Sequence, residues 1–342
     1  MHKCPNCFHK FKKQDALFRC ASIPQICPHV EDETYNTFHK DTIEAQGRVL
    51  VQPPRSKRDL LKRVMEQSSD RACDSCSTVT HQRVCPHCHH NLPDVFWDSD
   101  FVPIGFVCQR PQELEAYVTY LKKILEKYLA NDLGYILKPE VSATKFDLYL
   151  ERAVGEKKRT LPGTRSRKLL HIRFYPTDPE HLTKDFLGFE GVLLMCDKMN
   201  AAEGRSYVPD AVQNFILATQ RTGAEGSLYP KGGKISIPFG VVYNCFEALA
   251  PLLPPAHPLF QQGNHGAGYN QADGARISSE MLAYTGYWFG PNLLQLMKRY
   301  FSKYRLFCQS FSYPEVQPFL ANSGWRIEDP FLWVLKCSGR IG

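Results

Sequence analysis

From residue 101 onward, short apolar runs alternate with longer segments in which apolar residues recur every three or four positions. The short runs have the length of strands, and the recurring pattern is that of amphipathic helices. The predicted strands are residues 101–108, 169–175, 189–196, 237–243 and 305–310. The predicted helices are residues 114–128, 207–220 and 293–304. Because such alternation is typical of a mostly parallel sheet covered by helices on both faces, the pattern predicts an α/β domain.

Residues 1–92 differ, because they show little periodicity and carry four short clusters of cysteine. Within them, residues 46–58 contain Pro53-Pro54 and predict an extended connector, and residues 60–66 predict a short helix. The sequence therefore predicts two domains: a small module over residues 1–92 with an internal linker at about residues 28–70, and an α/β domain over residues 93–342. Residues 251–275 are rich in Pro, Gly and Asn and predict a long mobile loop.

The composition is that of a globular protein, with 43% hydrophobic and 23% charged residues. The longest apolar runs are far shorter than the ~20 residues that a membrane-spanning helix needs, so we expect no membrane partner. The amino terminus shows no apolar leader, and we therefore expect a cytoplasmic protein. In a reducing compartment, the 13 cysteines predict metal sites rather than disulfides.

Four cysteines form two closely spaced Cys-x2-Cys pairs, Cys73 with Cys76 and Cys85 with Cys88. Each such turn presents two thiolates to one ion, and two turns complete the tetrahedral set that zinc prefers. Four thiolates leave no open position for a reacting water, so the predicted zinc is structural. The histidines nearby are not needed as ligands and are expected at the surface: His81, His87, His89 and His90.

A second set combines Cys4 and Cys7, also spaced Cys-x2-Cys, with Cys20 and Cys27. The wider spacing of the last two leaves His29 open as an alternative ligand to Cys27. The four cysteines could also interleave with the later pairs, but we favour sequential pairing because it keeps each loop short. Each four-thiolate zinc site carries two net negative charges, so two sites lower the formal net charge from +7 to +3. The lower charge weakens the case for a nucleic-acid partner.

The order of motifs resembles a bacterial family in which a double zinc ribbon precedes a GTPase domain of the translation-factor-related (TRAFAC) P-loop class. The resemblance rests on the opening CPNC, on FRC at residues 18–20, on ACDSC and CPHCHHNLP up to Pro93, and on WRIEDPFLWVLKCSGRI at residues 325–341. It covers nearly the whole chain, although between these ends it depends on strand order and spacing. It implies a P-loop GTPase-like fold, and some such families are proposed to act in prokaryotic conflict or defence systems.

The phosphate loop implied by the resemblance is altered in this sequence. Such a loop needs glycine-rich backbone, a lysine for the β- and γ-phosphates and a Ser or Thr hydroxyl for magnesium. Here the terminal Gly-Lys-Ser falls on Glu113, Leu114 and Glu115, and Pro111 removes a backbone donor. Two carboxylates thus stand where phosphate oxygens would bind. No Gly-x4-Gly-Lys-Ser/Thr occurs anywhere in the chain.

The other two nucleotide-binding elements implied by the resemblance are altered as well. The magnesium-associated aspartate and the glycine that follows it fall on Pro176 and Pro179. At the guanine-binding element, Asn244 is kept, the lysine is replaced by Cys245, and Glu247 stands for the aspartate. We therefore expect a pseudo-GTPase, without catalytic residues and without bound nucleotide, that acts as a protein-binding or scaffolding subunit. One alternative is a GTP-binding protein with an unorthodox phosphate loop.

The second alternative is a nucleic-acid-binding zinc-ribbon protein that uses a basic segment, residues 151–173. Because no aromatic residue interleaves with its charges, we favour an exposed and poorly ordered loop over a nucleic-acid site. Its candidate residues for binding an anion or a partner are Lys157, Lys158, Arg159, Arg165, Arg167 and Lys168.

Overall fold

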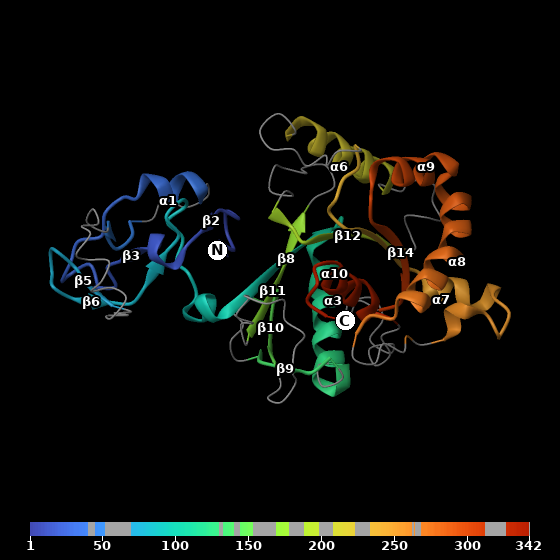
Figure 1. The fold of residues 1–342 in the computed structure, drawn as a ribbon, viewed down its shortest axis with the longest axis horizontal. Coiled ribbons are helices and arrows are strands. Elements are labelled where there is room, and N and C mark those ends of the chain that lie inside the picture. Colours follow the sequence, from blue (N-terminus) through green and yellow to red (C-terminus); the bar gives the residue numbers. More distant parts are fainter. Residues whose placement is uncertain are drawn as a thin grey trace. The chain divides into compact units, whose positions relative to one another are not determined.

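The computed structural model describes residues 1–39, 45–51, 70–129, 133–139, 144–152, 169–177, 188–197, 208–222, 233–261, 263, 268–311 and 326–341. The chain divides into two compact units, Met1–Phe101 and Val102–Gly342 (Figure 1). The first unit continues past the boundary predicted at residue 92, because Phe96 in the 3-10 helix η2 (Asp94–Asp98) packs among its buried residues. The connector and helix predicted for residues 46–66 lie mostly outside the described residues.

The first unit is built on very short antiparallel strands. The strand β3 lies in the middle of a three-stranded sheet, and two further strand pairs stand apart from it. A 3-10 turn, η1 (Lys13–Asp15), precedes β3, and the helix α1 (Glu33–Phe38) begins at Asp32, whose carboxylate accepts from the Tyr35 N–H. The strands are β1 (His2–Lys3) with β2 (Lys10–Phe11), β4 (Val49–Leu50) with β3 (Leu17–Arg19) and β7 (Arg83–Val84), and β5 (Arg71–Ala72) with β6 (Val79–Thr80).

The second unit contains a seven-stranded, mostly parallel sheet, which confirms the α/β class predicted from the sequence. Strands β8, β12, β13 and β14 are parallel, whereas β10 is antiparallel to both of its neighbours. The order across the sheet is β14 (Tyr304–Gln309), β13 (Phe239–Asn244), β12 (Gly191–Asp197), β8 (Ser99–Val107), β11 (Leu169–Thr177), β10 (Asp147–Arg152) and β9 (Tyr135–Leu137).

Helices cover both faces of this sheet (Figure 1). On one face, α3 (Pro111–Ile124) and α10 (Glu328–Cys337) share the main apolar core with the strands, and the π-helix η3 (Leu125–Leu129) follows α3. On the other face, Phe239 of β13 meets Phe215 of α6 (Val208–Thr222) at 5.1 Å, and the Tyr243 hydroxyl bonds Thr285 of α8 (Gln271–Phe289) at 2.8 Å. The remaining helices are α7 (Phe246–Leu249), η6 (Ala250–Leu252), η7 (Pro258–Phe260) and α9 (Pro291–Tyr300).

The prediction of a mobile loop over residues 251–275 is wrong for the described part of that stretch. It contains η7, and the last five residues already belong to α8, which begins at an Asn270 cap. The helix escaped the sequence pattern because its first turns are polar and include Gly274, a poor helix former. Tertiary contacts explain its stability here, since the Leu306 N–H of β14 donates to Ser278 of α8 at 3.1 Å.

The basic segment predicted as an exposed loop is in part a pair of strands. Residues 151–152 belong to β10 and residues 169–173 belong to β11, so the prediction is wrong at both ends. Leu170 and Ile172 are buried in the core, which is why the chain is drawn into the sheet there. The six candidate binding residues between Lys157 and Lys168 lie outside the described residues.

Candidate functional site

Three of the four cysteine clusters fold into the same turn. In each Cys-x2-Cys turn the first cysteine N–H donates to the carbonyl five residues on, at 2.9 Å, and its own carbonyl accepts from the residue four positions on. The residue after the second cysteine has a positive φ in all three cases: Phe8 (57°), Ser77 (58°) and His89 (54°). This left-handed residue bends the backbone so that both sulfurs face one point. The repeated spacing in the sequence therefore encodes a repeated local structure.

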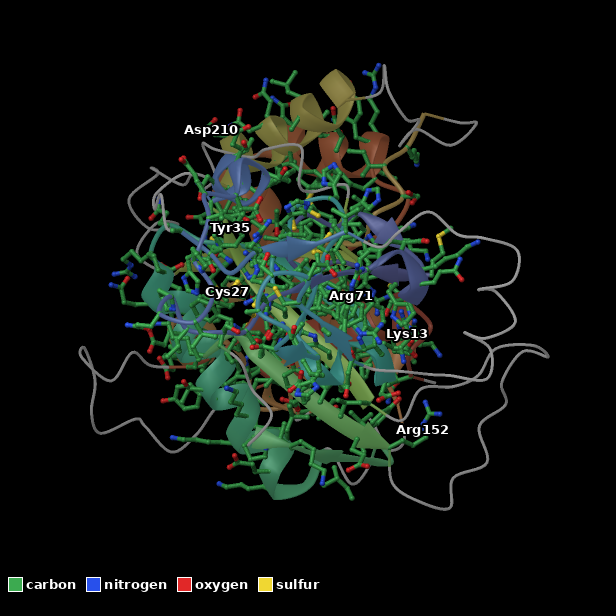
Figure 2. The ribbon with its side chains drawn as sticks, turned by 90° about the vertical axis from the view of Figure 1, so that its left-hand side faces the viewer. Lys13, Cys27, Tyr35, Arg71, Arg152 and Asp210 are labelled. Carbon is green, nitrogen blue, oxygen red and sulfur yellow. The ribbon has the colours of Figure 1, made fainter. Side chains whose placement is uncertain are left out.

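The eight cysteines assemble into two groups of four, and each group can hold a metal ion. Cys4, Cys7, Cys85 and Cys88 form the first, and the second combines the remaining four: Cys20, Cys27, Cys73 and Cys76. The closest sulfurs are 3.7–3.9 Å apart in both. A tetrahedral ion with metal–sulfur bonds of about 2.3 Å would separate its sulfurs by about 3.8 Å. Figure 2 draws side chains of both units and labels Cys27 and Lys13 of the first; Cys27 is buried and Lys13 is exposed.

The two groups are interleaved, so the sequential pairing favoured from the sequence is wrong. Strand β3 leads into Cys20 and β7 leads into Cys85, and the two strands are antiparallel with Leu17 opposite Val84. This register sends Cys20 and Cys85 to opposite ends of the strand pair, so they cannot share an ion. Loop length, which favoured sequential pairing, is outweighed by the pairing of strands far apart in the chain.

Cys27 completes the second group, and His29 does not. The His29 Nε2 lies 3.2 Å from the carbonyl oxygen of Ser22, away from the sulfurs. The Ser22 hydroxyl lies 3.2 Å from the Cys76 sulfur, and hydrogen bonds from Ser22 and then from Thr78 lower the pKa of that thiol to about 6. A lowered pKa favours the thiolate, which is the form that binds metal.

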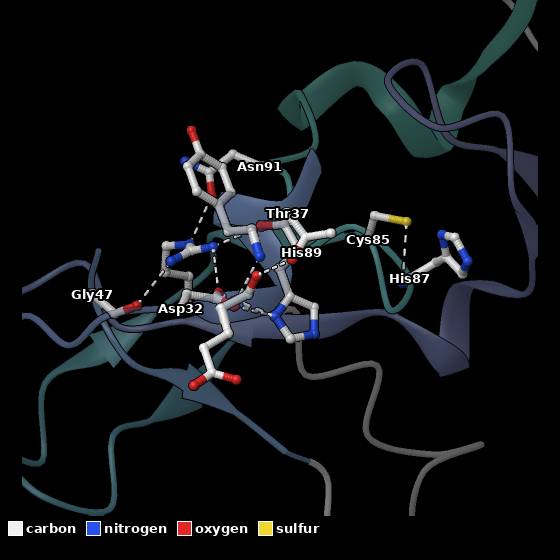
Figure 3. Close-up of polar contacts among 10 residues, drawn as sticks. Asp32, Thr37, Gly47, Cys85, His87, His89 and Asn91 are labelled. Carbon is white, nitrogen blue, oxygen red and sulfur yellow. Dashed lines mark hydrogen bonds and ion pairs between the residues drawn. The ribbon is translucent and has the colours of Figure 1, made fainter. Parts of the chain in front are cut away.

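A buried arginine of β3, Arg19, is bonded to several distant segments of the first unit, and its partners Asp32, Gly47, His89 and Asn91 are labelled in Figure 3. Arg19, 4% exposed, donates to the carbonyl oxygens of Gly47 (3.0 Å) and His89 (2.6 Å), to Asn91 (3.1 Å) and to Asp32 (3.3 Å). The Asp32 carboxylate also contacts the His89 Nδ1 at 2.8 Å. Burial by itself would raise the pKa of Asp32, but these bonds and that from Tyr35 lower it. His89 is thus part of the internal structure, contrary to its predicted surface position, whereas His81 and His87 are exposed.

In the second unit, the residues that the resemblance compares with a phosphate loop, Glu113 to Glu115, lie in the first turns of α3. The Glu113 side chain, 1% exposed, accepts from the Arg110 Nε at 3.1 Å. Leu114 is buried in the apolar core, and Glu115 is half exposed and pairs with Lys145 at 2.5 Å. The two carboxylates therefore do not occupy one position. The Glu113 side chain is on the buried face of the first turn of α3, and the Glu115 side chain is on the exposed face.

The guanine-element position is the end of β13. Asn244 is buried there: its side-chain amide donates to the Phe311 carbonyl at 3.1 Å and accepts from the Phe311 N–H at 2.9 Å. The Phe311 ring in turn lies near Tyr117 and Tyr120 of α3, with centroids 6.2 and 5.9 Å away. Glu247 is exposed in α7. At the magnesium element, Pro176 is exposed near the end of β11, and Pro179 lies outside the described residues.

Two buried charge clusters have no counterpart in the sequence analysis. The first cluster lies in β10 and β11. The Asp147 carboxylate accepts hydrogen bonds from the His171 Nε2 (3.0 Å), the Arg173 Nε and Nη2 (2.6 and 2.9 Å) and the Thr144 N–H (3.0 Å). The Tyr149 ring stacks on the His171 ring, with centroids 4.3 Å apart. The alternation of polar with apolar residues, such as Asp147-Leu148-Tyr149, is the sequence pattern that could have indicated these two strands. These bonds hold the Asp147 pKa well below its usual range, although burial alone would raise it. Burial lowers the His171 pKa, which favours the neutral ring.

The second cluster surrounds Arg326, whose side chain is completely buried. It binds Asp329 at 2.6 Å, the Gln261 carbonyl at 2.7 Å and Asp273 of α8. Arg326 and Asp329 belong to the closing WRIEDP motif, so this motif ties α10 to α8. Asp273 also pairs with the more exposed Arg276 at 2.6 Å.

The chain matches no protein-family model, and a search of curated proteins finds no match. Among the described residues, no helix is both long and apolar enough to cross a membrane.

Proposed function

We propose that this protein is a zinc-binding, catalytically inactive GTPase-like protein that serves as a protein-binding scaffold. The zinc part rests on the donor set. Both groups consist of four thiols at the sulfur spacing of a tetrahedral ion, and soft thiolates in this geometry select zinc or an iron–sulfur centre over hard cations. With four protein ligands no coordination position is left for water, so the role of the metal is structural.

The observation that carries the inactive part is the buried carboxylate of Glu113. A helix N-terminus attracts phosphate because its first N–H groups are unpaired and its dipole is positive. In α3 the first turn already holds its own carboxylate, which is 1% exposed and paired with Arg110 at 3.1 Å. At ~4 Å and an effective dielectric constant of about 20, a carboxylate without a counter-charge would repel each further unit of negative charge by about 4 kcal/mol, and the Arg110 charge offsets part of this repulsion. The Glu113 carboxylate thus takes the place that a phosphate would occupy at this helix N-terminus.

The end of β13 supports the same proposal. Both hydrogen-bonding ends of the Asn244 amide are used by the Phe311 backbone, so this side chain is not available to a base edge. Releasing it would leave two buried backbone groups without partners, at a cost of about 1–3 kcal/mol each. A nucleotide would have to supply this free energy before gaining any of its own contacts.

The scaffolding part rests on the surface of the first unit. Large hydrophobic side chains that are exposed among the described residues are concentrated there, although the first unit is the smaller of the two. They are Met1, Ile23, Ile26, Val30, Phe38, Val51 and Val79, against Ile136, Leu217, Leu252 and Tyr287 in the second unit. The first unit thus carries more exposed apolar side chains for its size than the second, and such side chains are available for burial against a protein partner.

Calorimetric titration with GTP and magnesium tests the inactive part. We expect no saturable heat change for the wild-type protein, and one-to-one binding would overturn the proposal. Glu113→Gln removes the buried anion and should increase affinity for inorganic triphosphate, while the matched change Glu115→Gln, at an exposed carboxylate, should not. If both variants respond equally, the buried carboxylate is not what excludes phosphate.

A further inference from the structure

A second basic region, residues 298–305, has the interleaved aromatic residues that residues 151–173 lack. Residues 281–314 contain no aspartate or glutamate, and residues 298–305 read Lys-Arg-Tyr-Phe-Ser-Lys-Tyr-Arg. Cations and aromatic rings therefore alternate in this stretch. Interleaving of this kind is typical of sites that hold the phosphates of a nucleic-acid strand while its bases stack on aromatic faces.

The fold brings further cations to this stretch at the amino end of β14. The Lys234 Nζ donates to the Lys298 carbonyl at 2.9 Å, and the Ile235 N–H donates to the Tyr300 carbonyl at 2.6 Å. Lys336, in the last turn of α10, lies near the same stretch, because the charges of Lys336, Lys303 and Arg305 all act on the Cys337 thiol. Burial raises the pKa of that thiol, and the three cations lower it. We call this set the β14 basic cluster: Lys234, Lys298, Arg299, Lys303 and Lys336.

The charges of the β14 basic cluster are available to a partner. Four of its members are exposed, and Lys336 is half-buried. Within the part of the chain that the structure describes, none of the five pairs with a carboxylate, whereas Lys138 and Lys145 at the opposite edge pair with Glu151 and Glu115. Glu190, an acidic residue at the same end of the strands, precedes β12 and thus lies two strands from β14.

Helix dipoles account for part of this arrangement but not for all of it. Lys298 and Arg299 lie in the last turn of α9, and Lys336 lies in the last turn of α10, where positive charge is favourable. Lys234 belongs to no helix, but its bond to the Lys298 carbonyl caps the carboxyl end of α9, so it gains from the same dipole. Lys303 lies beyond the last turn of α9 and belongs to no helix, so it adds positive charge beyond what the helix itself requires.

The aromatic residues favour a nucleic acid over a lipid surface or an acidic peptide as the anionic partner. Tyr300 and Tyr304 are half-buried, so part of each side chain reaches the surface, and the Arg299 guanidinium lies 5.4 Å from the centre of the Tyr300 ring. A lipid surface would also attract the cations, but anchoring on it uses exposed apolar side chains. Residues 290–305 contain no exposed large hydrophobic residue, and all of them are described. An acidic peptide would use the cations and leave the ring faces unused.

We propose that the β14 basic cluster, with Tyr300 and Tyr304, binds single-stranded nucleic acid, the cations holding phosphates and the rings stacking on bases. The cluster lies at the amino ends of the parallel strands. Ligands of open α/β sheets bind at the carboxyl ends, where Glu113 and Asn244 lie. The inference is therefore independent of the proposed loss of nucleotide binding, and either can fail without the other.

Fluorescence anisotropy with a labelled single-stranded RNA of about 16 nucleotides, the upper end of known site sizes, tests the proposal. We expect saturable binding by the full-length protein. The logarithm of the association constant should fall linearly with the logarithm of the salt concentration, by about 0.7 for each phosphate contacted. No binding at low salt would overturn the proposal.

Two double variants with the same change of charge locate the site. Lys298→Glu with Lys303→Glu should weaken binding at least roughly tenfold and reduce the salt slope by about 1.4, because two phosphate contacts are lost. Lys10→Glu with Lys12→Glu, at exposed lysines of the first unit, should leave both quantities unchanged. Equal losses in the two variants would show attraction to overall charge and would sink the proposal.

A third comparison separates nucleic acid from other anions. Tyr304→Leu should weaken RNA binding roughly five- to a hundredfold, whereas Tyr304→Phe, which keeps the ring, should not. Thermal unfolding of each variant checks that the fold is kept, and Tyr300→Leu repeats the test if Tyr304→Leu fails to fold. If the tyrosine variants bind normally and polyglutamate or anionic lipid vesicles compete as well as RNA does, the partner is an acidic protein or a membrane, and the proposal is wrong.

Discussion

The two units of this protein keep their folds by different means. In the first, strands are two or three residues long, and the buried apolar side chains form two small clusters in which the eight cysteine thiols take part. In the second, β8 and β11 run for nine residues, and a large apolar cluster joins the sheet to α3 and α10. From this comparison we expect the first unit, which lacks an extensive apolar core, to depend on bound metal ions, since metal-binding free energy becomes folding free energy.

Both units also bury an arginine, but they use it differently. Arg19 in the first unit binds two backbone carbonyls, the Asn91 side chain and one carboxylate, whereas Arg326 in the second binds two carboxylates and one backbone carbonyl. The first arrangement fixes the course of chain segments near the cysteine groups. The second holds opposite charges together inside an apolar core, where removal of one partner is costly.

The largest expected effect is that of metal removal. Chelation should unfold the first unit and leave the second folded, because a structural zinc of this kind contributes about 10–16 kcal/mol to folding. Hydrogen exchange resolved along the sequence measures this. Loss of protection in both units, or in neither, would contradict the comparison between them.

Interleaved ligation gives a sharper version of that experiment. Replacing Cys4, Cys7, Cys85 and Cys88 together by serine should leave one bound metal, because the second group is intact. The matched quadruple variant replaces Cys4, Cys7, Cys20 and Cys27 and should bind none, since both groups lose half of their ligands. Elemental analysis of the purified variants decides the matter, and sequential pairing would give the reverse result.

A smaller but still large effect is expected at the buried arginine of the second unit. Arg326→Leu should destabilise this unit by about 3–5 kcal/mol, because Asp273 and Asp329 would remain as buried charges without their partner. Arg276→Leu removes a more exposed partner of the same Asp273 and should cost within about 1 kcal/mol. Denaturant unfolding of the two variants gives both values. Similar values would show that burial does not set the strength of this cluster.

The pH dependence of the second unit should fall into two stages. The His171 pKa is depressed by burial, so the unfolded chain takes up a proton first and stability declines as pH falls below about 6.5. The Asp147 pKa is also depressed, so its contribution is present above about pH 4 and is lost as pH falls further. Urea unfolding between pH 7 and 3 gives the free energy of unfolding at each pH relative to its value at pH 7. The first stage of the decline should be missing in His171→Gln, and the second stage should be missing in Asp147→Asn. A wild-type stability that stays constant over this range would refute the assignment.

The smallest effect is expected at the surface of α3. Glu115 and Lys145 are both about half exposed, and exposed ion pairs contribute about 0–1 kcal/mol. Glu115→Gln should therefore change the stability of the second unit by less than about 1 kcal/mol in denaturant unfolding. A loss comparable to that of Arg326→Leu would mean that this pair is shielded from water.

The sequence by itself determined the local structures. The Cys-x2-Cys spacing specified three identical turns, because a turn of this kind needs only neighbouring residues to aim two sulfurs at one point. Apolar runs such as residues 101–108 and 189–196 specified buried parallel strands, because continuous apolar sequence of that length has few other places to go. The two-unit organisation followed from the contrast between these patterns.

Only the tertiary structure decided which local pieces meet. The pairing of Cys20 with Cys73 rather than Cys4 depends on the antiparallel register of β3 and β7, which lie more than sixty residues apart in the chain. In the same way, Asp273 became the partner of Arg326 because α8 and α10 converge, while its surrounding sequence looked like a loop. Residues close in sequence fix geometry through short-range sterics and hydrogen bonds, whereas contacts between distant residues depend on the packing of the whole unit.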